Sequence, residues 1–391
     1  MKKLNIVHIH TDYKFVSNSN SFIGDYFNNK IIIIQKDKPY VKRDHEDVDL
    51  YDDNRKDQKK IVEACATADV VVLYDLDITK SRIAVQLPPS IKIAWRFFGY
   101  ELYDRKKVKF LSERTKVFYR HKFNPNFIKK SKGHLYMVYE YLKYKQTSDQ
   151  LFNKALKRID YMLALSEEEY HFLKEEWPSL PDLVILARNN RKLNKEVLSS
   201  KIKPVILLGN SRTSYNNHLD LIDLIEKAPN KSNYDFTLLF SYGWSGDYAD
   251  AVRSAVIGKE HYTLLEDFIP YEEFNEFYKR PTALVINAYR QLAGANINMA
   301  FANGIKVYLN TKNIYREWLL NEGFKVFTIE DFENDLKNNA LNFDKDVAEH
   351  NFSNLKKFEE RRPKEDFQKE LFTKINTSIR THVPEFGQQK N

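Results

Sequence analysis

Short apolar runs alternate with segments of helical pattern along the first half of the chain. Six runs have the length of buried strands: Leu4–Ile9, Ile31–Ile34, Val70–Leu73, Ile91–Phe97, Tyr161–Leu165 and Leu183–Leu186. Segments with apolar residues at helical spacing lie between several of them, for example Gln58–Ala68 and Glu167–Glu176. Uninterrupted apolar runs are typical of strands buried on both faces, and their alternation with helices favours a parallel α/β sheet.

A second series of the same kind follows the polar segment Arg188–Lys203, which we interpret as a linker. Its strand-length runs are Val205–Leu208, Phe236–Phe240, Tyr262–Leu265, Ala283–Ile286, Val307–Leu309 and Val326–Thr328. The charged stretch that follows is helical in pattern. We therefore predict a Rossmann-like N-terminal domain at 1–190, a second at 204–350, and a helical tail at 351–391 that packs toward the first domain.

The composition agrees with this division. The chain has 391 residues, more than one ordinary core holds, and it is 42% hydrophobic and 30% charged, which indicates a folded globular protein. The sequence contains no run of 18 apolar residues, so we predict no membrane span. The start of the chain lacks the apolar core of a signal peptide. Cys65 is the only cysteine, so we expect a reducing cytoplasm. No Cys/His cluster has metal-ligand spacing, and we expect neither metal nor cofactor.

Positive charge is concentrated between Arg105 and Lys145. This stretch has thirteen Lys and Arg residues against two acids, a net charge of +11, whereas the whole chain carries +8. Aromatic residues such as Phe118 and Tyr119 are interleaved. This composition suits an anionic membrane surface, where each cation adds about 1 kcal/mol. Single-stranded nucleic acid and a solvated helical face with core aromatics are the alternatives.

The segment from Thr282 to Asn310 predicts an anion site. A buried strand is expected at Ala283–Ile286, and a polar turn then carries Arg290, Gln291, Gly294, Ala295 and Asn296. Small residues before a helix let the backbone approach a ligand, and the first N–H groups of that helix lack internal partners. The planar cation of Arg290 suits phosphate oxygens. An ordinary strand–loop–helix with an exposed arginine is the alternative.

Three further strand ends of the second half carry polar or glycine residues. They contribute Gly209, Asn210 and Ser211 before His218, then Ser241, Tyr242 and Gly243, and finally Ile269 and Glu272. Each motif alone also fits a capped helix start or a turn. Because the carboxyl ends of parallel strands meet at one edge of a sheet, we predict that these residues converge with Arg290 and bind the same ligand.

Two carboxylates follow predicted strands of the first half. Asp12 follows the first strand, and Glu101 follows Ile91–Phe97 after Gly99. Either is a candidate base for a sugar hydroxyl that attacks an anomeric carbon, or simply a surface or capping acid. The turn after the first strand lacks G-x-G-x-x-G, which argues against a nicotinamide or flavin enzyme. Walker A and G-x-S-x-G motifs are also missing from the sequence.

Three groups of residues from the predicted strand ends follow one another along most of the chain. They are Trp95 with Gly99-Tyr100-Glu101-Leu102-Tyr103, Leu208-Gly209-Asn210-Ser211 with Asn217-His218, and Ala288 to Gly294 with Gly304-Ile305 and Leu309-Asn310 behind it. In this order they resemble the family 56 glycosyltransferases, the TDP-4-acetamido-4,6-dideoxygalactose (N-acetylfucosamine) transferases of enterobacterial common antigen synthesis. Glu101 stands where the family has Asp, and Leu292 where it has a second Gln.

The resemblance implies a GT-B fold, in which two Rossmann-like domains face a cleft and a C-terminal helix crosses back to the first domain. It also implies a sugar-nucleotide donor in the C-terminal domain, a lipid-linked acceptor at the cytoplasmic membrane face, and no metal requirement. We therefore expect a hexosyltransferase that moves a deoxy- or acetamido-sugar from TDP, UDP or GDP to a lipid-linked or glycan acceptor in bacterial surface polysaccharide synthesis. It would be cytoplasmic and peripheral at the inner face of the cytoplasmic membrane, and would not bind nucleic acid.

Roles for the candidate residues follow from this expectation. We expect the diphosphate to be bound by Arg290, the turn Gly294–Asn296 and the loop Gly209–Ser211. Gln291 and His218 are further candidates for binding the donor. The nucleoside and sugar are assigned to Ser241–Gly243 and Ile269–Glu272, and deprotonation of the acceptor to Glu101 or Asp12. Two rival functions stay open, a GT-B-shaped sugar-nucleotide epimerase and a non-catalytic binder of sugar nucleotides or nucleic acid.

Overall fold

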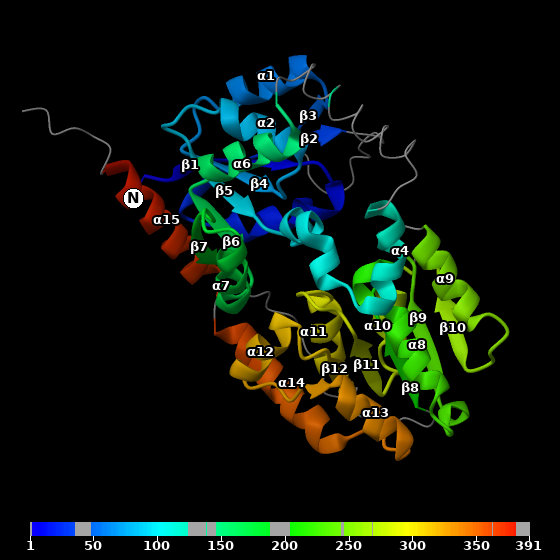
Figure 1. Ribbon diagram of the computed structural model, residues 1–391. Helices are drawn as coiled ribbons and strands as arrows, with labels where there is room; N and C mark the ends of the chain where they lie inside the picture. The colour runs from blue at the N-terminus through cyan, green and yellow to red at the C-terminus, as the bar shows by residue number, and fades with distance from the viewer. Residues whose placement is uncertain are drawn as a thin grey trace, which may run out of the picture. The chain divides into compact units, whose positions relative to one another are not determined.

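The computed structural model describes residues 2–35, 48–123, 138, 146–187, 204–243, 246–267, 269–361 and 363–380 (Figure 1). The chain forms two compact units. The first comprises Met1–Glu101, Ser131–Asn189 and Arg362–Asn391, and the second comprises Leu102–Lys130 and Asn190–Arg361.

Seven parallel strands form the sheet of the first unit, in the order β3-β2-β1-β4-β5-β6-β7. They are β1 (Leu4–His10), β2 (Phe27–Gln35), β3 (Val48–Asp52), β4 (Val70–Tyr74), β5 (Lys92–Arg96), β6 (Tyr161–Ala164) and β7 (Asp182–Ile185). Six of them coincide with the predicted apolar runs. The exception is β3, which lies at the edge of the sheet and has the alternating sequence Val-Asp-Leu-Tyr-Asp.

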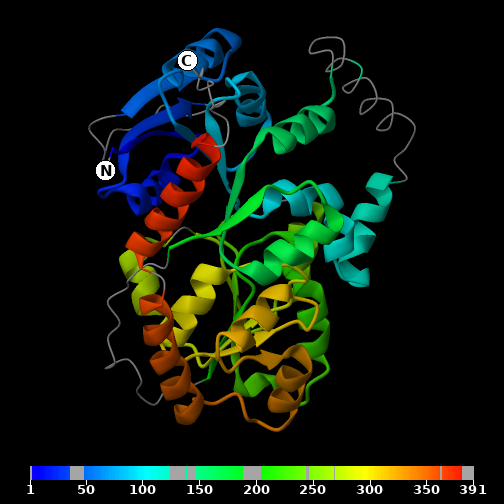
Figure 2. The ribbon, with the colours of Figure 1, turned by 90° about the vertical axis from the view of Figure 1, so that its left-hand side faces the viewer.

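Helices cover both faces of this sheet. They are the 3-10 helix η1 (Tyr13–Phe22), α1 (Arg55–Ala64), α2 (Ile78–Gln86), α6 (Ser148–Arg158), α7 (Glu167–Glu176) and α15 (Lys364–Arg380). Helix α2 packs between α1 and α6. On the other face, Phe367, Leu371 and Ile375 of α15 share a buried core with Val70 and Val72 of β4. Figure 2 shows α15 in red beside the blue strands. The final helix therefore belongs to the first unit, as predicted for the tail.

Six parallel strands form the sheet of the second unit, in the order β10-β9-β8-β11-β12-β13. They are β8 (Val205–Leu208), β9 (Asp235–Leu239), β10 (Tyr262–Leu265), β11 (Ala283–Ile286), β12 (Lys306–Leu309) and β13 (Phe327–Thr328). All six coincide with the second series of predicted runs. The two parallel α/β sheets predicted from the apolar pattern are thus confirmed.

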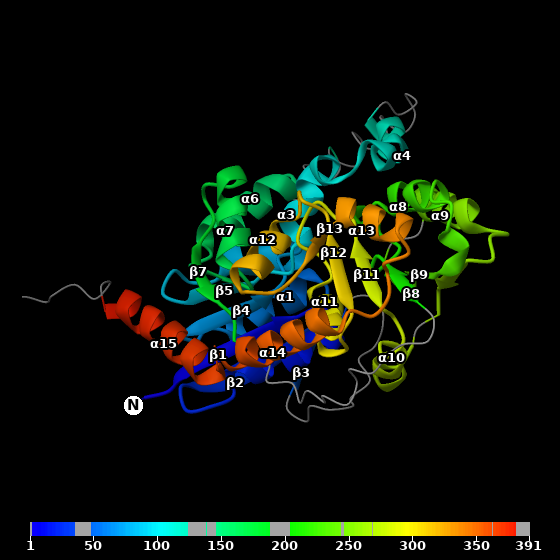
Figure 3. The same cartoon turned by 90° about the horizontal axis from the view of Figure 1, so that it is seen from below.

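The helices of the second unit lie in two layers. They are η4 (Ser214–Asn216), α8 (His218–Glu226), η5 (Lys231–Asn233), α9 (Asp247–Val256), α10 (Tyr271–Phe277), α11 (Gly294–Ala302), α12 (Ile314–Asn321), α13 (Ile329–Lys337) and α14 (Lys345–Glu360). Residues of α8, α9 and α13 share one buried core with the sheet, and residues of α11, α12 and α14 share another. Figure 3 shows α14 beside α11.

The observed units differ from the predicted boundaries 1–190, 204–350 and 351–391 in two places. The segment with α3 (Tyr100–Tyr103), η2 (Asp104–Phe110) and α4 (Glu113–Phe123) leaves the first unit after Glu101. Helix α4 packs against α8 and α9, and Phe118 contacts their core. Helix α14, where the predicted tail begins, stays in the second unit because Leu355 and Phe358 lie in its core. The apolar pattern did not reveal either assignment, since both depend on tertiary packing.

Candidate functional site

The strand order of the second sheet reverses between β8 and β11. From β8 the chain adds β9 and β10 on one side, and from β11 it adds β12 and β13 on the other. Ligands of open parallel sheets bind at such a reversal, beyond the carboxyl ends of the strands. The loop after β8 contains Gly209–Ser211, and the loop after β11 contains Arg290. The two loops are tied together, because the Gly209 N–H donates to the Val285 carbonyl at 2.9 Å and Asn217 Nδ2 donates to the Asn287 carbonyl at 2.8 Å.

Gly209 occupies a position that no other residue fits. Its φ is +68°, and a Cβ there would lie 2.4 Å from His218 Nε2 and 3.1 Å from Asn216 Oδ1. The absence of a side chain lets the imidazole of His218 and the amide of Asn216 pack directly against the backbone at the end of β8.

His218 begins α8 and is buried. Its backbone N–H donates to the Tyr248 hydroxyl at 2.7 Å. Burial lowers the pKa of His218 to about 3, so the ring is neutral at physiological pH. Within the described residues, Nε2 has no hydrogen-bond partner. That nitrogen is buried against Gly209 with an unused hydrogen-bonding position.

Hydrogen bonds join the β8 loop to the loop after β9. Asn210 Nδ2 donates to the Tyr242 hydroxyl at 2.6 Å, and the Arg212 N–H donates to the Tyr242 carbonyl at 2.9 Å. The Arg212 guanidinium also donates to the Ser241 carbonyl at 2.8 Å. These hydrogen bonds hold Tyr242 in place, although the residue is 54% exposed to solvent.

Arg290 is 7% exposed and lies between two tyrosine rings. Its guanidinium carbon is 4.3 Å from the ring centre of Tyr215 and 4.8 Å from that of Tyr103. Nη1 donates to the Gln291 carbonyl at 3.2 Å, whereas Nε has no partner within the described residues. The Tyr215 hydroxyl in turn donates to Asp104. The arginine is thus oriented by aromatic stacking and keeps part of its hydrogen-bonding capacity free.

Helix α11 starts directly after Arg290 and Gln291. Its N-cap Ala293 has a φ of +64° and provides no side-chain capping bond. The first N–H groups of the helix, at Gly294, Ala295 and Asn296, are therefore oriented as a partial positive charge that favours an anion. The side chain of Asn296 is occupied, since Nδ2 donates to the Tyr278 hydroxyl at 2.8 Å.

The two remaining predicted residues follow β10. Ile269 is half-buried, and Glu272 is exposed on α10. Their assignment to the nucleoside and sugar stays a prediction.

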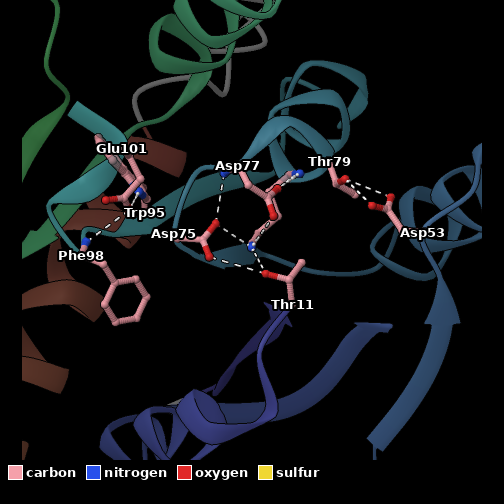
Figure 4. Close-up of polar contacts among 9 residues, drawn as sticks. Thr11, Asp53, Asp75, Asp77, Thr79, Trp95, Phe98 and Glu101 are labelled. Atoms are coloured by element: carbon pink, nitrogen blue, oxygen red, sulfur yellow. Dashed lines mark hydrogen bonds and ion pairs between the residues drawn. The ribbon is translucent and has the colours of Figure 1, made fainter. Parts of the chain in front are cut away.

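The first sheet has its own reversal, between β1 and β4. Figure 4 shows the polar contacts beyond these strands. Lys80 is fully buried, and its Nζ donates to Thr11 Oγ1 at 2.6 Å, to Asp75 Oδ1 at 2.7 Å and to Asp77 Oδ2 at 3.3 Å. Asp75 has a φ of +66°, and its side chain is 14% exposed. Burial raises the pKa of Asp75, and the Lys80 ammonium partly opposes that rise.

Sequence reasoning missed this group. Asp75 and Asp77 directly follow the predicted strand Val70–Leu73, which was a usable signal. Nothing in the sequence indicated that Lys80 would be buried, because lysines on helices are ordinarily exposed.

The two predicted bases occupy different environments. Glu101 is buried, and its Oε1 accepts hydrogen bonds from Trp95 Nε1 at 3.3 Å and from the Phe98 N–H at 3.1 Å (Figure 4). Burial raises the pKa of Glu101 to about 8, so the carboxyl group is largely protonated at neutral pH. Asp12 is only half-buried and lies next to Thr11 in sequence.

The predicted basic–aromatic stretch lies partly outside the described residues. The basic–aromatic stretch is described at 105–123 and 138 only, so Lys129, Lys130 and Lys132 are outside. In the described part, Arg114 pairs with Asp223 at 3.0 Å and the Tyr119 hydroxyl contacts Ser214 Oγ at 2.7 Å. These residues therefore pack on the second unit.

In the described ranges, no group of three or more His, Cys, Asp or Glu side chains is placed to hold a metal ion. None of the described helices is both long enough and apolar enough to cross a bilayer.

No protein-family model and no curated protein sequence matches the chain. Solved structures do match it along nearly its whole length. A sucrose-phosphate synthase from Thermosynechococcus elongatus is 11% identical, with a TM-score of 0.64 over 97% of this chain and 100% of that one. HepE from Anabaena in complex with UDP and glucose is 10% identical, with a TM-score of 0.60 over 96% of this chain and 100% of that one.

The lipopolysaccharide outer core galactosyltransferase WaaB in its apo form is 12% identical, with a TM-score of 0.57 over 97% of this chain and 100% of that one. At these identities the likeness concerns the fold. These glycosyltransferases are built from two parallel-sheet α/β domains, as this chain is. The chain therefore has the predicted GT-B fold.

Proposed function

We propose that this protein is a glycosyltransferase that moves a deoxy- or acetamido-hexose from a nucleoside diphosphate to a lipid-linked or glycan acceptor in bacterial surface polysaccharide synthesis. The fold shared with known glycosyltransferases supports the reaction class. HepE, of the same fold, was solved with UDP and glucose, which supports a sugar-nucleotide donor. The resemblance to family 56 supports TDP as the nucleotide.

The observation that carries the proposal is the position of Arg290. It follows β11 at the reversal of the second sheet, is nearly buried, and has a free Nε. The start of α11 and the loop that begins at Gly209 belong to the same edge. A cation, a helix N-terminus and a glycine at the carboxyl ends of two adjacent strands suit a diphosphate.

The chemistry follows from the charge that develops during transfer. As the bond between the anomeric carbon and the diphosphate breaks, negative charge grows on the leaving oxygen. Arg290 and the first N–H groups of α11 interact more strongly with that charge than with the intact donor, so they lower the barrier. His218 stays a predicted donor-binding residue, and its ring packs against Gly209 behind this edge.

The acceptor hydroxyl loses a proton as it attacks the anomeric carbon. Asp12 and Glu101 stay candidates for the base if configuration is inverted. Asp75 joins them, because its side chain reaches solvent beside Lys80 and Thr11 at the reversal of the first sheet. Glu101 would act as a base only in an alkaline range, because burial raises its pKa to about 8.

The finer parts of the proposal rest on the sequence. Metal independence follows from the resemblance, and peripheral attachment to the inner face of the cytoplasmic membrane follows from the basic–aromatic stretch. EDTA should leave turnover unchanged. Full-length protein should sediment with vesicles containing anionic lipid but not with neutral ones.

A sugar-nucleotide screen tests the central proposal. Thermal shifts with TDP-, UDP- and GDP-sugars should identify the donor, and labelled sugar should then pass to a polyisoprenyl diphosphate-linked glycan. Conversion of the donor without any acceptor would instead indicate an epimerase, and binding without turnover a non-catalytic binder. Failure to bind any sugar nucleotide would overturn the proposal.

A further inference from the structure

A second cation shares the tyrosine ring on which Arg290 stacks. Helix η2 places Lys107 Nζ 5.0 Å from the ring centre of Tyr215 and 4.9 Å from that of Tyr119. The guanidinium carbon of Arg290 lies 4.3 Å from the same Tyr215 ring. Two positive charges from distant parts of the sequence therefore meet at one aromatic side chain within the second unit.

The tyrosine at the centre of this arrangement is firmly held. Tyr215 is 4% exposed and its hydroxyl donates to Asp104. The preceding residue, Ser214, contacts the Tyr119 hydroxyl. Tyr215 also belongs to η4, in the loop that begins at Gly209. The ring thus fixes two cations relative to the loop at the end of β8.

The two positive charges exceed the negative charge beside them. Within the described residues, neither Lys107 nor Arg290 forms an ion pair. The nearby Asp104 accepts the hydrogen bond of the Tyr215 hydroxyl and offsets one of the two charges only. Arg290 also retains its unpartnered Nε although the residue is only 7% exposed. Aromatic faces stabilise cations, but they do not neutralise the remaining positive charge. A ligand with more than one negative charge would.

We propose that Lys107 and Arg290 form a phosphoryl-binding clamp around Tyr215. The proposal rests on the function proposed above and adds a ligand-binding residue from the segment that follows β5. Lysine acts as a compact point charge, and arginine as a planar fork, so the pair suits two phosphoryl groups of one diphosphate. The diphosphate of the sugar nucleotide and that of a polyisoprenyl-linked acceptor share this chemistry, and the experiment distinguishes them.

Calorimetric titration of the full chain provides the test. The probes are UDP, TDP and GDP, the corresponding free nucleosides, inorganic pyrophosphate, and a short-chain polyisoprenyl diphosphate. The key variant is Lys107→Met, which keeps an unbranched stem on the ring and removes the charge. Its thermal melting curve should match that of the unaltered protein.

The matched control is Lys259→Met. Lys259 also lies over a tyrosine, 6.0 Å from the ring centre of Tyr262, but it pairs with Glu226 at 3.3 Å. Loss of one charge-assisted contact in Lys107→Met should weaken diphosphate binding about tenfold and reduce its salt dependence. Nucleoside binding should not change, and the control should bind all ligands as the unaltered protein does.

The outcomes separate cleanly. Weaker binding of nucleoside diphosphates alone assigns the clamp to the donor, and weaker binding of polyisoprenyl diphosphate alone assigns it to the acceptor. If Lys107→Met binds every diphosphate normally while the unaltered protein transfers sugar, the clamp is wrong and the proposed function stands. If the unaltered protein binds no diphosphate at all, both proposals fail.

Discussion

The guanidinium of Arg290 stacks 4.3 Å from the ring centre of Tyr215 while the Tyr215 hydroxyl is bound to Asp104. The orientation of this arginine is therefore set by residues of two other segments and not by its own loop alone. A cation held in advance costs little reorganisation when charge appears on a ligand, which is the condition for effective transition-state stabilisation.

Substitution of Arg290 should affect turnover strongly. We expect Arg290→Ala to lower the rate of sugar transfer by roughly 100-fold or more, because a charge stabiliser of the leaving group is lost. Arg290→Lys should recover little, since an ammonium cannot stack as a planar fork between Tyr103 and Tyr215. Steady-state kinetics with the identified donor provide the measurement, with exposed Arg280→Ala as the control. Near-normal turnover of Arg290→Ala would remove this residue from the mechanism.

Gly209 and Gly258 form a matched pair for testing the close approach at the end of β8. Their φ values are +68° and +75°, but a Cβ would meet His218 Nε2 at 2.4 Å in the first case and nothing within 4 Å in the second. Both alanine variants carry the backbone strain. Gly209→Ala should lose about 1–3 kcal/mol more of the free energy of unfolding than Gly258→Ala because of overpacking. Equal losses in urea titrations would show that His218 moves aside freely.

Lys80 should be essential for the stability of the first unit. Lys80→Met leaves Asp75 and Asp77 without their buried cation, so we expect a loss of about 3–5 kcal/mol in the free energy of unfolding. Lys60→Met is the control, because Lys60 forms an exposed pair with Asp57 one helical turn away and should change stability very little. A small loss in Lys80→Met, measured by denaturant unfolding, would mean that the two aspartates protonate or rehydrate easily.

Glu101 should make stability fall as the pH rises. Its pKa is raised to about 8 in the folded protein, whereas an unfolded glutamate titrates near its ordinary value. Between these two values the folded state binds the extra proton, so the free energy of unfolding decreases with increasing pH. Glu101→Gln should remove about 1–3 kcal/mol of that decrease between pH 5 and roughly pH 8. The control Glu63→Gln, at an exposed position, should retain the full decrease in the free energy of unfolding. If this free energy depends on pH in the same way in both variants, the raised pKa of Glu101 is contradicted.

Burial of His218 should make the free energy of unfolding fall as the pH decreases into the acid range. Burial lowers its pKa to about 3, so the unfolded chain binds a proton that the folded state excludes. Below the ordinary histidine pKa, stability should fall by up to about 1.4 kcal/mol per pH unit, and His218→Gln should show a shallower slope. His8, whose pKa is lowered to about 4, contributes separately. The measurement is the slope of the free energy of unfolding against pH between pH 6.5 and roughly pH 4.5, compared between the unaltered protein and His218→Gln.

The sheets were predictable because their strands are central and parallel. Runs such as Val70–Leu73 and Ala283–Ile286 are buried on both faces, and the sequence shows this directly as uninterrupted apolar residues. Edge strand β3 was not predicted, because Asp49 and Asp52 are partly exposed and interrupt the run of apolar residues.

Much less of the candidate site could be predicted. Gly209 and Arg290 were visible because each lies just beyond a predicted strand, and topology brings those ends together. Tyr215 and Lys107 gave no such signal, since a tyrosine and a lysine in loops have many ordinary explanations. Their relation to Arg290 exists only after the segment beginning at Leu102 has packed on the second unit, and local sequence patterns do not encode that packing.

The chain passes between the two units at Glu101, Lys130, Asn189 and Arg361. No contiguous gene fragment therefore encodes either unit completely. A product ending near residue 190 would lack α15 and carry η2 and α4 without the surface they cover, whereas one beginning near residue 204 would lack the segment that supplies Tyr103 and Lys107. Dissection of this chain into separately expressed halves should yield aggregating products. A soluble second unit would require Leu102–Lys130 to be grafted onto it through a new connection.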